Sequence, residues 1–308
     1  MAALAGAVSG AAIAGPAINQ FEVKDLESGP GDFEFQSQNA YSTGQPRRRF
    51  VETAPGDFAF DDNSVVRQRE ALEIQVGITD YFRIRVGIEY EQERLDDPLS
   101  PGVANAFGDL QLDELALEGV VVFVKPKKEA VGLGLLVEYG YPVSGDIESP
   151  AELFIGPIIE ARTGPWSLIA NLAFVKFLGG QAAAGNDDFV RDEKWDFSYF
   201  LQGQHRFSES FALALEAYGT FDRLGNSGTR DEEALLFGDT NLHRAGPVLY
   251  YTFFPDRGGL SRAAGGASLS GDGEEAKELA VSIGAGTLFG LNENTPDLTY
   301  KLSIEVEY

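Results

Sequence analysis

The sequence predicts an all-β protein: a single antiparallel transmembrane β-barrel of about twelve strands, with short periplasmic turns and longer extracellular loops. Three observations predict this fold. Apolar and polar residues alternate in many segments, turns join these segments into hairpins, and short connections alternate with long ones. Alternation sends successive side chains to opposite faces of a strand. One face can then meet lipid while the other lines the barrel interior.

The amino-terminus differs from the rest of the chain. Residues 2–17 are almost wholly small and apolar, and Ala12-Ile13-Ala14 fits the cleavage site of a secretory signal peptide. No Lys or Arg precedes Lys24, so the basic region of such a signal is missing. A buried helix is the alternative interpretation. We predict a signal-peptide-like segment at 1–17 and an outer-membrane β-barrel over 18–308.

Strands follow at regular intervals after this segment. Each alternates in hydropathy or is rich in β-branched and aromatic residues, and their even number is typical of bacterial single-chain barrels. The expected strands are 32–41, 72–78, 84–90, 110–124, 130–143, 152–162, 166–178, 194–206, 210–222, 243–254, 278–291 and 297–308.

The connections fall into two classes that alternate along the chain, as expected of periplasmic turns and outer loops. Short turns lie near 79–82, 125–129, 163–165 and 206–210. Long polar connections lie at 44–64, 95–108, 144–151, 179–193 and 223–240. Residues 255–277 are long, Gly-rich and Ser-rich but fall on the short-turn side, which indicates a flexible periplasmic insertion or a miscounted strand.

The last strand, 297–308, shows the alternation most clearly. Its apolar face carries Leu298, Tyr300, Leu302, Ile304, Val306 and Tyr308, and its other face is polar. Because the apolar side chains are β-branched, aromatic or leucine, they suit a pleated surface. The pattern resembles the closing strand of a bacterial outer-membrane barrel.

Composition excludes several classes of protein. The formal net charge of −24, from 24 basic and 48 acidic residues, repels phosphates and excludes nucleic acid as a partner. The absence of Cys excludes disulfides and thiolate metal sites. No apolar run reaches the ~18 residues of a membrane-spanning helix. Nothing in the sequence indicates a metal or a cofactor.

Aromatic residues gather near the predicted strand ends, where membrane interfaces favour them. These residues are Tyr81, Phe82, Tyr139, Tyr141, Trp166, Phe177, Trp195, Phe207, Phe211, Phe221, Phe253 and Phe254.

The alternation also assigns a face to each strand residue. The lipid-facing set is predicted to include Leu72, Ile74, Val76, Ile84, Val86, Ile88, Leu133, Leu135, Val137, Leu213, Leu215, Leu302, Ile304 and Val306. The predicted lumen-lining residues are Glu73, Arg83, Arg85, Glu89, Glu118, Glu138, Glu160, Glu216, Lys301 and Glu305, with Glu91, Arg162 and Glu307 on the same face.

Carboxylates outnumber basic side chains on the lumen face, and this permits two interpretations. A water-filled acidic lumen would favour cations over anions. Glu–Arg pairs could instead brace the wall and close the pore, since small barrels are commonly filled by their own side chains. Burying so many charges without water or partners is prohibitive.

Catalysis is not predicted. The two histidines are His205 and His243, and although Ser208 and Ser210 lie near His205, the spacing singles out no Ser–His pair. Acidic loop clusters such as Asp96-Asp97 lack calcium-loop spacing. The triplet Arg47–Arg49 fits either lipid phosphates or a solvated charge run.

Two segments resemble one family. Residues 283–291 with the closing strand, and Gly77-Ile-Thr-Asp-Tyr-Phe-Arg-Ile-Arg-Val-Gly-Ile-Glu-Tyr90, are similar to the outer-membrane transporters named for the meta-pathway of phenol degradation. The resemblance implies a Gram-negative outer membrane and a transporter barrel, but not phenol as ligand. It implies four partners: membrane lipid, lipopolysaccharide, a small-molecule solute and the barrel-assembly machinery.

We therefore expect a channel or transporter-like barrel for passive passage or uptake of small solutes, apolar or aromatic ones among them. The alternatives are a closed structural or interaction barrel, a secreted soluble β-sandwich and an outer-membrane hydrolase. The sequence leaves open whether the lumen is open or plugged.

Overall fold

The structure is a computed structural model. It describes residues 21–46, 63–97, 105–126, 131–143, 150–178, 194–228, 236–238, 240–255 and 279–308, and the backbone of 49–54 and 57–61. The predicted signal segment 1–17, the triplet Arg47–Arg49 as side chains and most of the 255–277 connection lie outside these residues.

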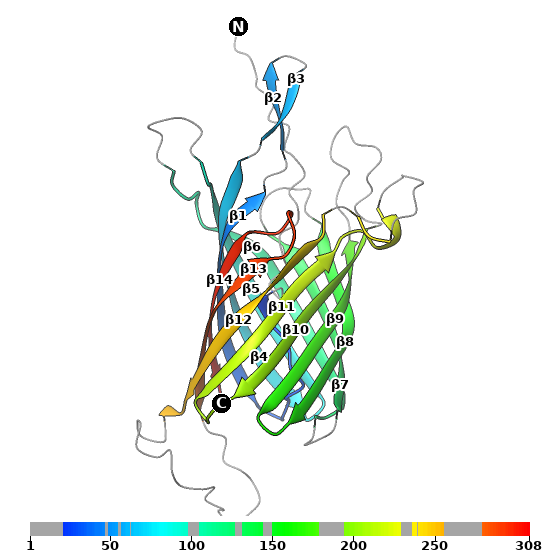
Figure 1. The fold of residues 1–308 in the computed structure, drawn as a ribbon. Coiled ribbons are helices and arrows are strands. Elements are labelled where there is room, and N and C mark those ends of the chain that lie inside the picture. The colour runs from blue at the N-terminus through cyan, green and yellow to red at the C-terminus, as the bar shows by residue number, and fades with distance from the viewer. Residues whose placement is uncertain are drawn as a thin grey trace, which may run out of the picture.

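Twelve antiparallel strands close into one barrel, which confirms the predicted fold class and number of strands (Figure 1). The barrel strands are β1 (Phe33–Pro46), β4 (Ser64–Thr79), β5 (Phe82–Leu95), β6 (Gln111–Val124), β7 (Val131–Pro142), β8 (Ala151–Thr163), β9 (Trp166–Leu178), β10 (Trp195–Arg206), β11 (Phe211–Phe221), β12 (Leu242–Phe253), β13 (Ala280–Gly290) and β14 (Leu298–Glu307).

The first and last strands seal the barrel. They pair from Glu34 opposite Glu307 to Thr43 opposite Leu298. Beyond this ladder, the backbone N–H of Phe33 donates to the Tyr308 carbonyl at 2.9 Å, and the Tyr308 N–H donates to the Phe33 carbonyl at 2.8 Å. Closure removes the exposed sheet edges, which is what permits strands to span a membrane.

The strands on either side of the first long connection are longer than predicted. β4 begins at Ser64 rather than at Leu72, and β1 continues to Pro46. Their outer parts carry polar residues on both faces, so hydropathy alternation does not mark them. The connection itself holds a small separate hairpin, β2 (Arg49–Ala54) with β3 (Asp57–Asp61), which the sequence analysis did not predict.

The short connections β4–β5, β8–β9 and β10–β11 lie at the end of the barrel where the chain terminates (Figure 1). The connections β1–β4, β5–β6, β7–β8, β9–β10 and β11–β12 lie at the other end, whereas the longest connection, β12–β13, joins strands at the same end as the short ones. We call these the lower and the outer end, following the predicted orientation. The described residues contain no helix long and apolar enough to cross a membrane.

Every residue of the predicted lipid-facing set points out of the barrel. The alternation is clear on β5, where the exposed fractions are 2% for Arg83, 37% for Ile84, 4% for Arg85 and 51% for Val86. Soluble monomers rarely expose apolar patches larger than a few hundred Å². An apolar band around the whole wall is what lipid requires.

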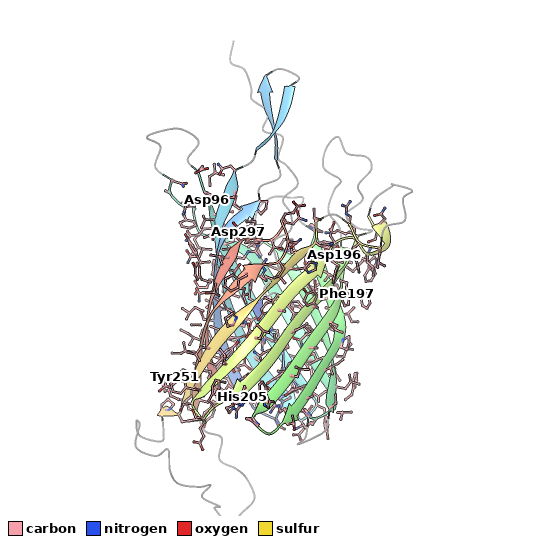
Figure 2. All side chains as sticks on the ribbon, viewed as in Figure 1. Asp96, Asp196, Phe197, His205, Tyr251 and Asp297 are labelled. Atoms are coloured by element: carbon pink, nitrogen blue, oxygen red, sulfur yellow. The ribbon has the colours of Figure 1, made fainter. Side chains whose placement is uncertain are left out.

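Aromatic rings border this band at both ends. Phe174 and Phe197 pack near the outer end with ring centroids 5.5 Å apart, and Trp166 and His205 pack near the lower end at 4.4 Å (Figure 2). From Phe197 to His205 the chain advances about 20 Å along the axis, at ~3.3 Å per residue and a tilt of ~40°, close to the ~25 Å expected of the apolar band. Phe177 lies near the end of β9, as predicted, but it faces inward rather than toward the membrane and is buried, because it shares a strand face with Asn171.

The outward position of Val86 generates a prediction. Val86→Arg should lower the free energy of unfolding by about 2–4 kcal/mol, because the substitution places a charge near the bilayer midplane. Urea unfolding in lipid vesicles would measure this, with Glu209→Arg in the β10–β11 turn as the control. Equal stability of both variants would contradict the assignment of the faces.

Candidate functional site

Nine of the ten predicted lumen residues are buried inside the barrel. They are Glu73, Arg83, Arg85, Glu89, Glu118, Glu138, Glu160, Glu216 and Lys301. Glu305 is half-buried near the lower rim. Of the other three on this face, Glu91 and Arg162 are half-buried and Glu307 is exposed.

The chain before β1 also lies inside the barrel, and we call residues 21–28 the plug. Lys24 and Leu26 are each 1% exposed, although they belong to no strand. Figure 1 shows this blue start of the chain within the wall. Side chains from β5, β8, β9 and β11 contact it, so the plug crosses the lumen rather than following one strand. The sequence alone does not predict the plug.

Leu26 anchors the plug in an apolar pocket of the wall. It packs with Val120, Val122, Leu136 and Ile158. Its side chain fills the space that a Cβ at Gly132 or Gly134 would occupy. These two glycines on β7 therefore make room for the plug, which explains their place in a strand where glycine otherwise weakens packing.

Wall side chains satisfy the backbone of the plug. Asn171 on β9 accepts a hydrogen bond from the Lys24 N–H at 2.6 Å and donates one to the Lys24 carbonyl at 2.8 Å. A Glu160 carboxylate oxygen accepts from the Leu26 N–H at 2.9 Å. Arg83 donates to the carbonyls of residues 25 and 27 at 2.9 and 2.6 Å. The wall thus supplies the partners that buried peptide groups require.

Ion pairs hold the centre of the plug. The Lys24 ammonium lies 3.1 Å from a Glu118 oxygen and 3.7 Å from a Glu73 oxygen, and it also pairs with Glu22. Arg85 pairs with Glu22 at 2.5 Å and with Glu73 at 2.8 Å. The plug and the wall therefore contribute charges of both signs to one buried network.

Similar pairs brace the rest of the wall. The ammonium of Lys301 on β14 lies 2.8 Å from a carboxylate oxygen of Glu216 on β11, although the two residues are far apart in the sequence. The Tyr218 hydroxyl donates a hydrogen bond to the same carboxylate. Arg69 on β4 pairs with Glu91 and, at 3.3 Å, with Glu89.

Glu138 is the least compensated carboxylate of the described wall. It is 0% exposed and stands directly opposite Glu118 on the neighbouring strand. Neither of its oxygens has a hydrogen-bond partner among the described residues. The centre of the lumen therefore has an excess of acidic groups even with Lys24 in place.

The described lumen is packed rather than water-filled. A water-filled pore would leave its lining accessible to solvent, whereas Glu138, Glu160 and Glu216 are all 0% exposed. A cavity of about 10 Å³ beside Phe21 and Arg69 has room for about one water. The arrangement matches the braced alternative, with the addition of the plug.

An ionic cluster joins the outer ends of β10 and β11. Lys194 lies 3.0 Å from Asp196 and 2.9 Å from Asp222. Burial alone would lower the pKa of Lys194, but the two carboxylates outweigh burial and raise the pKa above its usual value. Burial raises the pKa of Asp222, but Lys194 and the hydrogen bonds from Thr240 and Arg223 together outweigh burial and lower the pKa overall. Burial raises the pKa of Asp196, the third member of the cluster, against the opposing effect of Lys194.

Neither histidine forms a catalytic pair among the described residues. His205 packs against Trp166 and Phe207, and His243 meets the Tyr199 hydroxyl at 3.1 Å. Ser208 accepts backbone hydrogen bonds within its own turn.

Two groups of three carboxylates lie close enough together to share a cation. They are Glu34 with Glu305 and Glu307, and Glu89 with Glu91 and Asp113. An arginine already neutralises part of each group: Arg85 pairs with Glu34, and Arg69 pairs with Glu89 and Glu91.

Comparison with known proteins identifies the fold. No family model and no curated protein matches the chain. Among solved structures, it is similar to the COG4313 outer membrane channel from Pseudomonas putida F1, with a TM-score of 0.57 and 12% identity over 93% of this chain and 98% of that chain. The transport unit of the autotransporter AIDA-I from Escherichia coli gives a TM-score of 0.48 and 12% identity over 94% and 93%. The first likeness shows a shared fold, that of an outer-membrane β-barrel.

The two hydrogen bonds of Asn171 generate a prediction. Asn171→Leu should weaken docking of the plug by about 1–3 kcal/mol, because it leaves a buried N–H and a buried carbonyl of Lys24 without partners. Hydrogen exchange at the plug amides should then be faster, while exchange in the strands is unchanged.

Ser198→Ala is the matched control for this test. Ser198 also faces the lumen, but its hydroxyl bonds Thr220 and not the plug. If the plug amides exchange as slowly in Asn171→Leu as they do in Ser198→Ala, the hydrogen bonds of Asn171 do not hold the plug and the prediction is contradicted.

Proposed function

We propose that the protein is an outer-membrane channel or transporter for passive passage or uptake of small solutes, closed by its plug in the described state. The observation that carries this proposal is that the lumen is filled by a segment outside the barrel sheet. Small barrels can be filled by wall side chains alone. A segment held only by side-chain contacts can leave without breaking any strand pair.

The predicted export signal bears on this proposal. If residues 1–17 are removed and the unit 18–308 remains, three residues precede Phe21 of the plug. The plug would then be a free chain end. Its withdrawal toward the lower end would uncover a passage lined by Glu73, Glu118 and Glu138.

The proposed location is the outer membrane of a Gram-negative bacterium. The exposed apolar band and the aromatic rings at its two ends support it. Membrane lipid and lipopolysaccharide are then the surrounding partners, and the barrel-assembly machinery is the partner for insertion. The barrel-assembly machinery inserts closed β-barrels of this kind, with an even number of strands, into the outer membrane.

The proposed solutes include apolar or aromatic compounds. The outer half of the lumen holds an apolar cluster that includes Phe154, Phe177, Phe200 and Tyr218. Such a cluster offers little to hydrophilic solutes and much contact area to apolar ones. The resemblance to transporters named for phenol degradation is in line with this class.

A closed structural barrel is the second candidate. The complete burial of Glu138, Glu160 and Glu216 favours it, because a braced lumen needs no opening to be stable.

A disulfide that ties the plug to the wall, and that can be reduced again, distinguishes the proposed channel from the closed structural barrel. Leu26 contacts Gly134 and the chain has no native Cys, so Leu26→Cys with Gly134→Cys can be joined by a single disulfide. In planar bilayers, the oxidised variant should be silent and the reduced variant should conduct in steps. Each single-Cys variant is the control, and should conduct irrespective of oxidant. Silence of both forms of a folded barrel would favour the structural candidate.

The uncompensated carboxylates predict the selectivity of the open state. Cations should pass in preference to anions, because withdrawal of Lys24 removes a positive charge from among Glu73 and Glu118. Glu138→Gln should reduce the cation preference, measured as the reversal potential in a salt gradient. Glu209→Gln, in a turn outside the lumen, should leave it unchanged. An anion-selective reversal potential of the unmodified barrel would contradict the prediction.

A further inference from the structure

Arg244 is a buried cation near the outer end of the lumen. It lies on β12, next to the strand end at Leu242, and is 5% exposed. One guanidinium nitrogen donates to the Thr299 hydroxyl at 3.2 Å, and the guanidinium carbon lies 4.9 Å from the centre of the Phe21 ring. These contacts use only one of the five N–H donors of the side chain.

Arg244 differs from every other buried basic side chain of the described residues. Lys24, Arg69, Arg83, Arg85 and Lys301 each pair with at least one carboxylate. Arg244 pairs with none in the described part of the chain. The charged groups that act on it most are Arg69 and Arg67, which have its own sign.

This imbalance cannot be relieved by loss of a proton. A buried carboxylate such as Glu138 can become neutral by taking up a proton, but a guanidinium does not deprotonate in proteins. A buried charge without a partner is strongly unfavourable. The negative charge that Arg244 requires must therefore come from a group outside the described wall.

We propose that Arg244 is the centre of a binding site for the carboxylate group of a small organic solute. The planar guanidinium presents parallel N–H groups that match the two oxygens of a carboxylate. The Thr299 and Ser42 hydroxyls lie 3.0 Å apart beside it. Only one of their two hydrogens is used between them, so the other can donate to the same anion. The Phe21 ring of the plug, which lies against the guanidinium, adjoins the site.

The site restricts the proposed solutes to those that carry a carboxylate group. Its biological role rests on the proposed transport function. Binding of a carboxylate to Arg244 can nevertheless be measured whether or not the barrel conducts. The carboxylate would enter from the outer end, above the acidic centre of the lumen. Recognition at the outer end is thus the role of the site, and Phe21 links it to the position of the plug.

Isothermal titration of the refolded barrel with sodium benzoate, in low-chloride buffer, tests the proposal. Benzamide is the matched neutral ligand, because it has the same ring and shape without the charge. Benzoate should bind and benzamide should not. Arg244→Gln should weaken benzoate binding at least tenfold. Arg223→Gln, which removes a rim arginine already paired with Asp222, is the charge-matched control and should bind as the unmodified protein does.

Arg244→Lys keeps the test decisive if Arg244→Gln does not fold. It retains the positive charge but cannot form two parallel hydrogen bonds, so benzoate affinity should fall severalfold. Equal benzoate affinity in the unmodified and Arg244 variants would overturn the proposal. Equal binding of benzamide and benzoate would overturn it too, since the ring alone would explain binding. Absence of benzoate binding to the unmodified protein would overturn the proposal as well. The proposed channel function could stand in each of these cases.

Discussion

The ion pairs between Lys24 and the wall carboxylates are the interaction on which the described state of the lumen depends. Lys24 lies within pairing distance of Glu73 and Glu118, which come from β4 and β6, so one side chain of the plug connects separate parts of the wall. Removing one partner of a buried pair typically costs about 3–5 kcal/mol, because the other charge is left uncompensated. Opening the lumen therefore requires water and mobile cations to replace the ammonium as it leaves.

The wall and the plug differ in how far the sequence predicts them. Alternation of apolar and polar residues on strands such as β5 predicts the fold class, the number of strands and the outward and inward directions of Val86 and Arg85, because each face of the wall meets one environment, lipid or lumen. The plug shows no such alternation of apolar and polar residues. Its contacts join residues far apart in the chain, such as Lys24 with Asn171, and depend on the closed shape of the barrel. The available signal was the pair Gly132 and Gly134, whose missing side chains leave room for Leu26.

Charge is distributed unevenly along the lumen. The centre holds the Glu118 and Glu138 pair, opposite each other and incompletely neutralised, whereas Arg244 near the outer end has no described carboxylate partner. The net charge of −24 indicates an acidic protein but cannot locate this one basic site. Sequence reasoning missed Arg244 because pairing, not residue type, distinguishes it from Arg85. A solute entering from the outer end would meet the arginine before the acidic centre.

The burial of the plug can be measured most directly by thiol labelling. Leu26→Cys places a single thiol at the deepest apolar contact of the plug, and Leu236→Cys places one at an outer position that is 71% exposed. In folded protein in lipid vesicles, a water-soluble maleimide should label Leu236→Cys rapidly and Leu26→Cys far more slowly, because the Leu26→Cys thiol is reached only while the plug is withdrawn or the barrel is unfolded. Labelling of Leu26→Cys in the folded barrel at the rate of Leu236→Cys would contradict a lumen closed by residues 21–28.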